Sequence, residues 1–161
     1  MPITVFSEQV GELIQWVNTQ TGAVATGTTI MPADNTIPQN TEGDEYMTLA
    51  ITPTSAINIL LIDVVINLGF VPTAGNEILQ IALFQDATAS AIASALGYSL
   101  DNGLDCVKFR HKMTAGTTSA TTFKVRAGNS IAGTITFNGE SGGALHGGVL
   151  ASSITIMEVR P

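Results

Sequence analysis

The sequence has few charged residues, few aromatic residues and a single cysteine. Charged residues make up 12% of the 161 residues, against about 25% in ordinary soluble domains. So few charged side chains leave much of a monomer's surface apolar, and we expect part of that surface to be buried between chains. Cys106 has no partner for an intrachain disulfide, so the fold does not depend on an oxidising compartment.

Basic residues are scarcer than acidic ones, and long apolar segments are absent. The chain has 13 Asp and Glu against 6 Lys and Arg, whereas a nucleic-acid-binding surface needs net positive charge. The longest apolar stretch, around residues 59–66, is interrupted by Asp63 and is too short to span a bilayer. No basic segment followed by an apolar one opens the chain. We therefore expect no nucleic-acid partner, no membrane insertion and no export signal.

Residues that could perform catalysis are few. His111 alternates with Val107, Phe109 and Met113, which predicts a core or interface histidine; the alternative is a ring of histidines on an oligomer axis that binds a metal or an anion. His146 lies in the loop SGGALHGG, which lacks the Lys and the following helix of phosphate-binding loops. The sequence contains no GxSxG motif and no Cys or His pair at ligand spacing. We predict no catalytic residue, no metal site and no cofactor.

Carboxylates cluster at two places, Glu42 to Glu45 and Asp101 to Asp105. Either cluster could hold calcium in a bent loop, but the EF-hand spacing is absent, so solvated turn residues are the simpler interpretation. Paired carboxylates that cleave glycosides need a defined separation, which a sequence does not give. A polysaccharide-cleaving enzyme on a β scaffold therefore stays a minor alternative.

Segments rich in Val, Ile, Thr and Phe recur between clusters of Gly, Asn, Asp, Pro and Ser, which is typical of an antiparallel β-sandwich or barrel. We predict one all-β domain over residues 13–161, preceded by an N-terminal docking segment over residues 1–12. Apolar residues at helical spacing between Phe6 and Val17 leave a short amphipathic helix as the alternative for this start. The expected strands are 13–18, 23–31, 46–51, 58–69, 78–85, 89–95, 106–113, 120–127, 133–138 and 150–159.

The strand around residues 59–69 is apolar on both faces. Leu60, Ile62 and Val64 begin a fully apolar face, and the opposite face is also mostly apolar. Such a strand is either central in the fold or part of a subunit interface. We predict that this second face, together with the histidine of a later strand, forms a self-association interface: Ile59, Leu61, Asp63, Val65, Asn67 and His111.

Basic residues concentrate in two successive strands, all at even-numbered positions. If these strands pair as a hairpin in which even-numbered residues lie opposite even-numbered residues, the basic side chains share one face. Because like charges repel, we expect acidic residues within or between subunits to neutralise them; the alternative is an anionic ligand, such as a phosphorylated or acidic surface glycan. The predicted ligand-binding patch is Lys108, Arg110, Lys112, Lys124 and Arg126.

A resemblance to a known family rests on the joint presence and order of four segments: TGAVATGTTIMPADNTIPQNTEGDEYMTLAITPTSAINILLIDV, ALFQDATASAIA, FRHKMTAGTTSATTFKVRAG and GGVLASSITIMEV. Together they resemble a family of domains found in phage tail fibres, head fibres and related virion proteins, over about residues 14–161. The resemblance implies an antiparallel jelly-roll β-sandwich, similar in build to tumour-necrosis-factor-like heads, that associates as a homotrimer.

The resemblance also implies a function. We expect a non-enzymatic virion structural protein, assembled in the host cytoplasm, that decorates a capsid or forms a fibre head. Its N-terminal segment would dock on other virion proteins, and its exposed surface would attach to a host cell-surface glycan. Because barely a dozen residues precede the expected domain, we expect a short head fibre, a decoration protein or a knob and not a whole long fibre. A lectin-like glycan-binding module outside any virus is the main alternative, although an aromatic content of 6% disfavours stacking on sugars.

Overall fold

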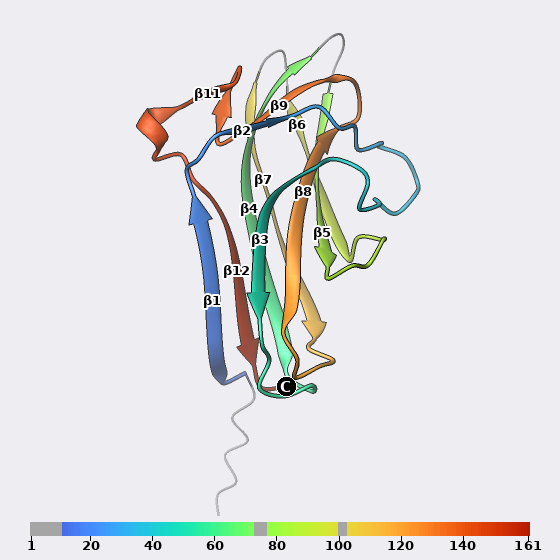
Figure 1. Cartoon of the computed structure of the whole chain (residues 1–161), viewed down its shortest axis with the longest axis vertical. Helices are drawn as coiled ribbons and strands as arrows, with labels where there is room; N and C mark the ends of the chain where they lie inside the picture. The colour runs from blue at the N-terminus through green and yellow to red at the C-terminus, as the bar shows by residue number, and fades with distance from the viewer. Residues whose placement is uncertain (1–10, 73–76, 100–102) are drawn as a thin grey trace, which may run out of the picture.

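The computed structural model describes residues 11–72, 77–99 and 103–161, and these form two antiparallel sheets that face each other (Figure 1). The long strands of the larger sheet lie in the spatial order β1 (Leu13–Thr21), β12 (Ser152–Val159), β4 (Ile59–Pro72) and β7 (Leu104–Thr114). Those of the smaller sheet lie in the order β3 (Asp44–Ile51), β8 (Thr121–Asn129), β5 (Glu77–Gln85) and β6 (Ala93–Ser99).

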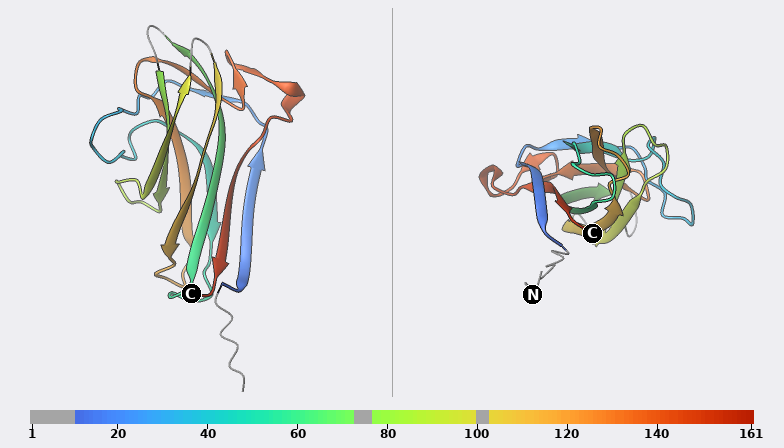
Figure 2. Two further views of the ribbon diagram at one scale, coloured as in Figure 1. Left: turned by 180° about the vertical axis from the view of Figure 1, so that it is seen from behind. Right: turned by 90° about the horizontal axis from the view of Figure 1, so that it is seen from below.

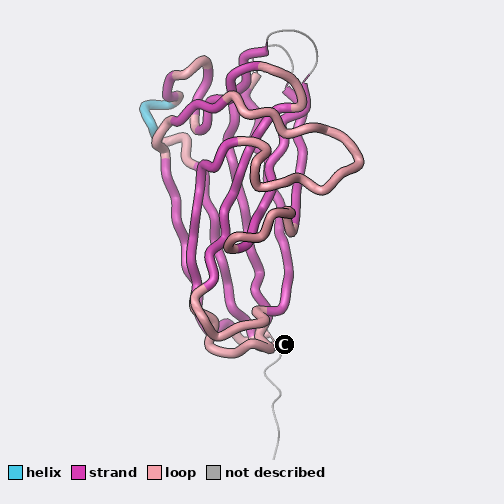
Figure 3. The backbone as a smooth tube through the Cα atoms, turned by 45° about the vertical axis from the view of Figure 1, so that its right-hand side comes forward, coloured by secondary structure: helices cyan, strands magenta, loops and turns pink. Residues whose placement is uncertain are grey.

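Short elements complete one end of the molecule, while loops gather at both ends of the strands (Figure 3). Beyond the first residue of β12, β9 (Gly133–Phe137) pairs with β4, and β2 (Ala25–Gly27) pairs with β9. The hairpin of β10 (Gly139–Glu140) and β11 (Gly143–Ala144) precedes the 3₁₀ turn η1 (His146–Gly148). Within the described ranges, no helix has the length and apolar character needed to cross a membrane.

The pairing of the strands identifies a jelly roll. Going inward from the chain ends, β1 pairs with β12, β3 with β8, β4 with β7 and β5 with β6, and every pair is antiparallel. Successive pairs alternate between the larger and the smaller sheet. Eight long strands wound in this nested way form the double Greek key of a jelly-roll sandwich, so the predicted fold class is confirmed.

The core lies between the sheets and is built mainly from β4. Its even-numbered residues from Leu60 to Phe70 have no exposed surface, as the fully apolar face of this strand predicts. They pack against inward-facing side chains of β5, β8 and β12, such as Ile81, Phe123 and Ile154. Alternation of inward and outward side chains therefore determines which residues remain for the two outer surfaces.

Most predicted strands are found within a few residues of their expected positions. One is displaced: the strand expected at 89–95 begins at Ala93, because residues 86–91 turn and bond to a neighbouring loop, with Ala91 N donating to Pro38 O at 2.9 Å. The expected strand at 23–31 shrinks to β2. The helix considered for the start is wrong from Leu13 onward, where β1 begins; the rest of that segment, residues 1–10, lies outside the described residues.

Candidate interaction surfaces

The outer face of the larger sheet is a four-by-four array of side chains. The left view of Figure 2 faces this sheet, with β1 in blue, β12 in red and β4 in green. Residues opposite each other in antiparallel strands point to the same face, so the pairing register arranges the outward side chains in rows. From one end to the other, the rows are Leu13, Val159, Ile59, Thr114; Trp16, Met157, Leu61, Lys112; Asn18, Thr155, Asp63, Arg110; and Gln20, Ser153, Val65, Lys108.

The first two rows form an apolar patch, defined as Leu13, Val159, Ile59, Trp16, Met157 and Leu61. Trp16 is 62% exposed and Leu13 is 52% exposed, while the other four side chains are half-buried. Nothing in the described part of the chain covers this face. A contiguous apolar patch of this kind on a small domain indicates an interaction surface.

The last two rows are mainly polar and contain a bidentate ion pair. Arg110 donates from Nε to Asp63 Oδ1 and from a terminal nitrogen to Asp63 Oδ2, both at 2.6 Å. Asn18 donates to Thr155 Oγ1 at 2.8 Å. The predicted interface residues of β4 therefore divide into two pairs. Ile59 and Leu61 lie in the apolar half of the face, and Asp63 and Val65 lie in the polar half.

Two of the predicted interface residues are placed differently from the prediction. Asn67 is only 7% exposed, and its side-chain amide donates to Ala151 O at 2.8 Å, so it is a buried and bonded residue and not an outer-surface one. His111 lies opposite Ile62, so it faces the interior, as its alternation with apolar residues predicts, and burial lowers its pKa. Grouping His111 with the outward residues of β4 is therefore wrong, since the register places it on the other face of the sheet.

The prediction of a single basic patch is also wrong. β7 pairs with β4 and β8 pairs with β3 and β5, so the two strands belong to opposite sheets and form no hairpin. The five residues divide into Lys108, Arg110 and Lys112 on the larger sheet and Lys124 and Arg126 on the smaller one. The alternation of side chains correctly predicts that all five point outward. They do not share one face, because the loop that joins β7 to β8 crosses from the larger sheet to the smaller one.

Two acidic residues of the same chain form ion pairs with three of these five cations. Arg110 pairs with Asp63, as described above. Lys124 Nζ and Arg126 lie 3.7 Å and 3.8 Å from Glu45 Oε2. Lys108 and Lys112 have no carboxylate within ion-pair distance among the described residues. The expected pairing with acidic residues of the same chain is therefore found for Arg110, Lys124 and Arg126 but not for these two lysines.

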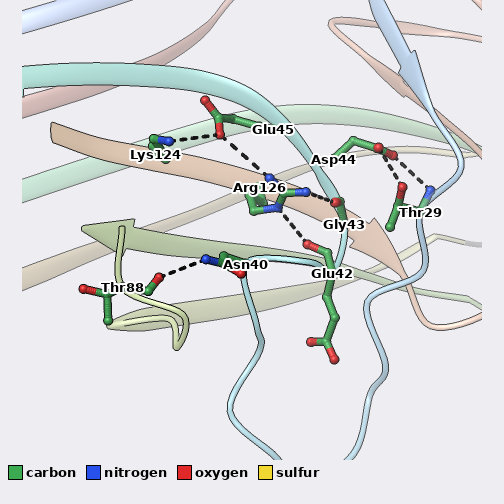
Figure 4. Close-up of polar contacts among 9 residues, drawn as sticks. All are labelled: Thr29, Asn40, Glu42, Gly43, Asp44, Glu45, Thr88, Lys124 and Arg126. Atoms are coloured by element: carbon green, nitrogen blue, oxygen red, sulfur yellow. Dashed lines mark hydrogen bonds and ion pairs between the residues drawn. The ribbon is translucent and has the colours of Figure 1, made fainter. Parts of the chain in front are cut away.

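Arg126 and its neighbours hold a long loop, residues 28–43, against the smaller sheet (Figure 4). The guanidinium of Arg126 donates to Glu42 O at 2.9 Å and to Gly43 O at 2.6 Å. Asp44 accepts hydrogen bonds from the backbone and hydroxyl of Thr29. Met31 in this loop is fully buried and packs against β5, so this cluster stabilises the fold.

The carboxylates considered as calcium ligands are occupied in separate contacts. Glu42 accepts from Gln39 N at 2.9 Å, whereas Asp44 and Glu45 bond to the loop and to β8 as described. Asp101 lies outside the described residues. Over the described ranges, no three His, Cys, Asp or Glu side chains gather closely enough to hold a metal ion.

Sequence reasoning missed four of the six residues of the apolar patch. Leu13, Trp16, Met157 and Val159 lie on strands that were predicted, but their outward faces mix apolar and polar residues and show no pattern by themselves. The apolar character emerges only when β1 and β12 lie beside β4. That juxtaposition pairs strands from the two ends of the chain, which no local pattern reveals.

No protein-family model matches the sequence, and no curated protein matches it. Solved structures do match. Eiger TNF from S. frugiperda is 9% identical, with a TM-score of 0.48, and the match covers 89% of this chain and 92% of that chain. The infectious bursal disease virus VP2 subviral particle is 12% identical, with a TM-score of 0.41 and coverage of 99% of this chain and 43% of VP2.

The tailspike protein 4 enzymatically active domain of bacteriophage CBA120 also matches, at 16% identity, a TM-score of 0.28 and coverage of 76% of this chain and 18% of that chain. This chain thus spans less than half the length of VP2 and of the tailspike domain. Viral capsid and phage tailspike domains are among the similar structures. At these identities the likeness concerns the fold alone.

Proposed function

We propose that this chain is a non-enzymatic structural protein of a virus particle, which assembles as a homotrimer and forms a capsid decoration or a fibre head that attaches to the host surface. The observation that supports it most directly is the apolar patch on the outer face of the larger sheet. The resemblance of residues 14–161 to phage virion domains supports the location in a virus particle and the trimeric state.

The apolar patch has the composition expected of an association surface. It includes an exposed Trp16 and a partly exposed Met157, and aromatic residues and Met are enriched in protein interfaces. Burial of each large apolar side chain stabilises a complex by roughly 1.5–3 kcal/mol before the cost of association. The charged residue Lys112 lies on β7 at the border of the patch, opposite Leu61, which matches the polar rim of a typical interface.

Sedimentation at micromolar concentration tests the assembly. We expect the wild-type protein to sediment as a trimer and Trp16→Lys as a monomer, because a charge in place of the most exposed side chain of the apolar patch would have to be buried without a partner. Val149→Lys is the matched control, since Val149 is 81% exposed and lies between η1 and β12, at the end of the larger sheet opposite to the apolar patch. It should remain a trimer.

A monomeric wild-type protein at this concentration would contradict the assembly. Purified virus particles test the location: antibody labelling viewed by electron microscopy should find the wild-type protein at a fixed position on the particle. Absence of the protein from purified particles would contradict the virion role, whatever the oligomeric state. The docking of residues 1–12 on other virion proteins stays a prediction of the same proposal.

A further inference from the structure

The polar half of the larger sheet's outer face is hollowed into a groove of about 560 Å³. This is within the range of small-molecule sites, roughly 300–1,000 Å³. The groove crosses three strands, and two adjacent rows of the side-chain array provide its outward side chains. They are Ser153, Val65 and Lys108 in one row and Thr155, Asp63 and Arg110 in the next.

Positive charge in the groove is available to a ligand. Lys108 is exposed and has no carboxylate partner within the described part of the chain. Arg110 uses Nε and one terminal nitrogen to hold Asp63, so its other terminal nitrogen is not used in that pair. Two cations against one carboxylate make the groove locally positive on a protein whose formal net charge is −7.

Hydroxyl groups and an apolar side chain complete the lining. Thr155 Oγ1 accepts a hydrogen bond from Asn18, which leaves its own proton free to be donated. Ser153 makes no side-chain hydrogen bond within the described ranges. Val65 lies between Ser153 and Lys108 in the same row and offers an apolar surface between these polar groups.

We infer that this groove binds an acidic sugar of the uronic-acid type, an inference that rests on the attachment role proposed above. The sugar carboxylate would bind Lys108 and the free side of Arg110 through charge-assisted hydrogen bonds. Asp63 distinguishes this ligand from a simple anion: its carboxylate repels an inorganic anion, whereas its remaining lone pairs accept hydrogen bonds from sugar hydroxyls. Val65 would contact the C–H face of the sugar ring.

The groove and the apolar patch occupy different rows of the same face. Successive rows are two residues apart along a strand, or about 7 Å. Leu61 of the apolar patch is one row from Asp63 of the groove and two rows from Val65, so the two surfaces adjoin but share no outward side chain. Association and sugar binding can therefore be measured separately.

Binding can be tested by NMR titration of the isotope-labelled full chain with D-glucuronate, D-glucose and sodium sulfate at equal ionic strength. We expect glucuronate to shift the amides of Val65, Lys108 and Ser153, with weaker effects from glucose and sulfate. Lys108→Ala should weaken glucuronate binding about tenfold, because a charge-assisted hydrogen bond is lost. Lys112→Ala removes the same charge from the same face of β7 outside the groove, and should leave binding unchanged.

Equal weakening by Lys108→Ala and Lys112→Ala would overturn the inference, since it would indicate attraction by general charge. So would binding of sulfate as tight as that of glucuronate, or absence of shifts in the groove. Sedimentation of the same samples separates the two proposals. A trimer that does not bind glucuronate contradicts the groove alone, and a monomer that binds it contradicts the assembly alone. If the wild-type trimer does not bind glucuronate and Lys108→Ala dissociates it, the groove contacts a second copy of the chain and not a sugar.

Discussion

Glu158 is a buried carboxylate that ties the end of β12 to the loop before β4. It has no exposed surface and accepts hydrogen bonds from Gln15 Nε2 and Asn58 Nδ2, each at 2.6 Å. Thr54 donates to it from both its backbone and its hydroxyl, at 2.9 Å and 2.8 Å. Burial alone raises the pKa of Glu158, but these hydrogen bonds outweigh it, and the net pKa lies below the ordinary value.

We predict that Glu158→Gln lowers the free energy of unfolding at pH 7 by about 3 kcal/mol, because the amide places an N–H against donors that need an acceptor. Urea unfolding followed by circular dichroism, at one fixed protein concentration, measures this. Glu140→Gln is the control, since Glu140 on β10 makes no such set of contacts; its effect should stay within about 0.5 kcal/mol. Equal stability of the two variants would contradict the role of Glu158.

The pH dependence of the same variant follows from the direction of the shift. A carboxylate whose pKa is lower in the folded than in the unfolded state stabilises the fold above the unfolded value, here near 4.5, and this contribution is lost as the pH falls through the folded value. The difference in stability between wild type and Glu158→Gln should therefore be largest at neutral pH and shrink below about pH 4.5.

At the scale of single elements, Arg126 of β8 contributes a two-carbonyl contact to the attachment of the loop of residues 28–43. The planar guanidinium of Arg126 reaches two successive carbonyls, those of Glu42 and Gly43. A lysine could not bond both with the same geometry. The neighbouring Lys124 makes only a long ion pair with Glu45, and its side chain is 39% exposed.

We predict that Arg126→Ala loosens this loop, with a loss of about 2 kcal/mol of stability. Amide exchange should rise at Met31 and Gly43, whose N–H groups bond to Asn129 O and Ile30 O, by about tenfold or more if the loop opens locally. Lys124→Ala should change stability by less than about 1 kcal/mol, as for other exposed ion pairs. Unchanged exchange in Arg126→Ala would mean that other contacts hold the loop.

The sequence predicts strands and their faces far better than their partners. Alternation correctly assigns Lys124 and Arg126 to an outer face and Phe123 to the core, because side-chain direction is a local property of a strand. The assumed hairpin of β7 and β8 failed because consecutive strands of a jelly roll often belong to different sheets. The burial of Glu158 could not be predicted for a related reason, since it depends on long-range contacts: its hydrogen-bond donors come from Gln15 and from residues 54–58, far away in the sequence.

At the scale of the whole molecule, the outer surfaces of the two sheets each expose apolar side chains. The larger sheet has the apolar patch around Trp16. On the smaller sheet, Leu96 and Tyr98 on the edge strand β6 are 56% and 68% exposed. Leu96 lies opposite Gln80, whose side chain bonds to the outer loop at Met31 O, so these residues face outward beside that loop.

Two different apolar surfaces on one chain are what a cyclic assembly requires. A twofold dimer uses the same patch on both copies, whereas a threefold ring joins one patch to a different patch on the next copy. We therefore predict that the proposed trimer joins the apolar patch of one copy to the Leu96 and Tyr98 surface of its neighbour. Under this arrangement Tyr98→Lys should abolish assembly as fully as Trp16→Lys does, although the two residues lie on opposite sheets.

Mixing the two variants distinguishes this ring from face-to-face pairing. Trp16→Lys retains an intact β6 surface and Tyr98→Lys retains an intact apolar patch, so one good interface can form between them. We expect each variant to sediment alone as a monomer and an equimolar mixture to form a one-to-one complex that cannot grow. Face-to-face pairing predicts instead that Tyr98→Lys assembles normally and that the mixture contains no mixed complex, because Trp16 would then be needed on both partners.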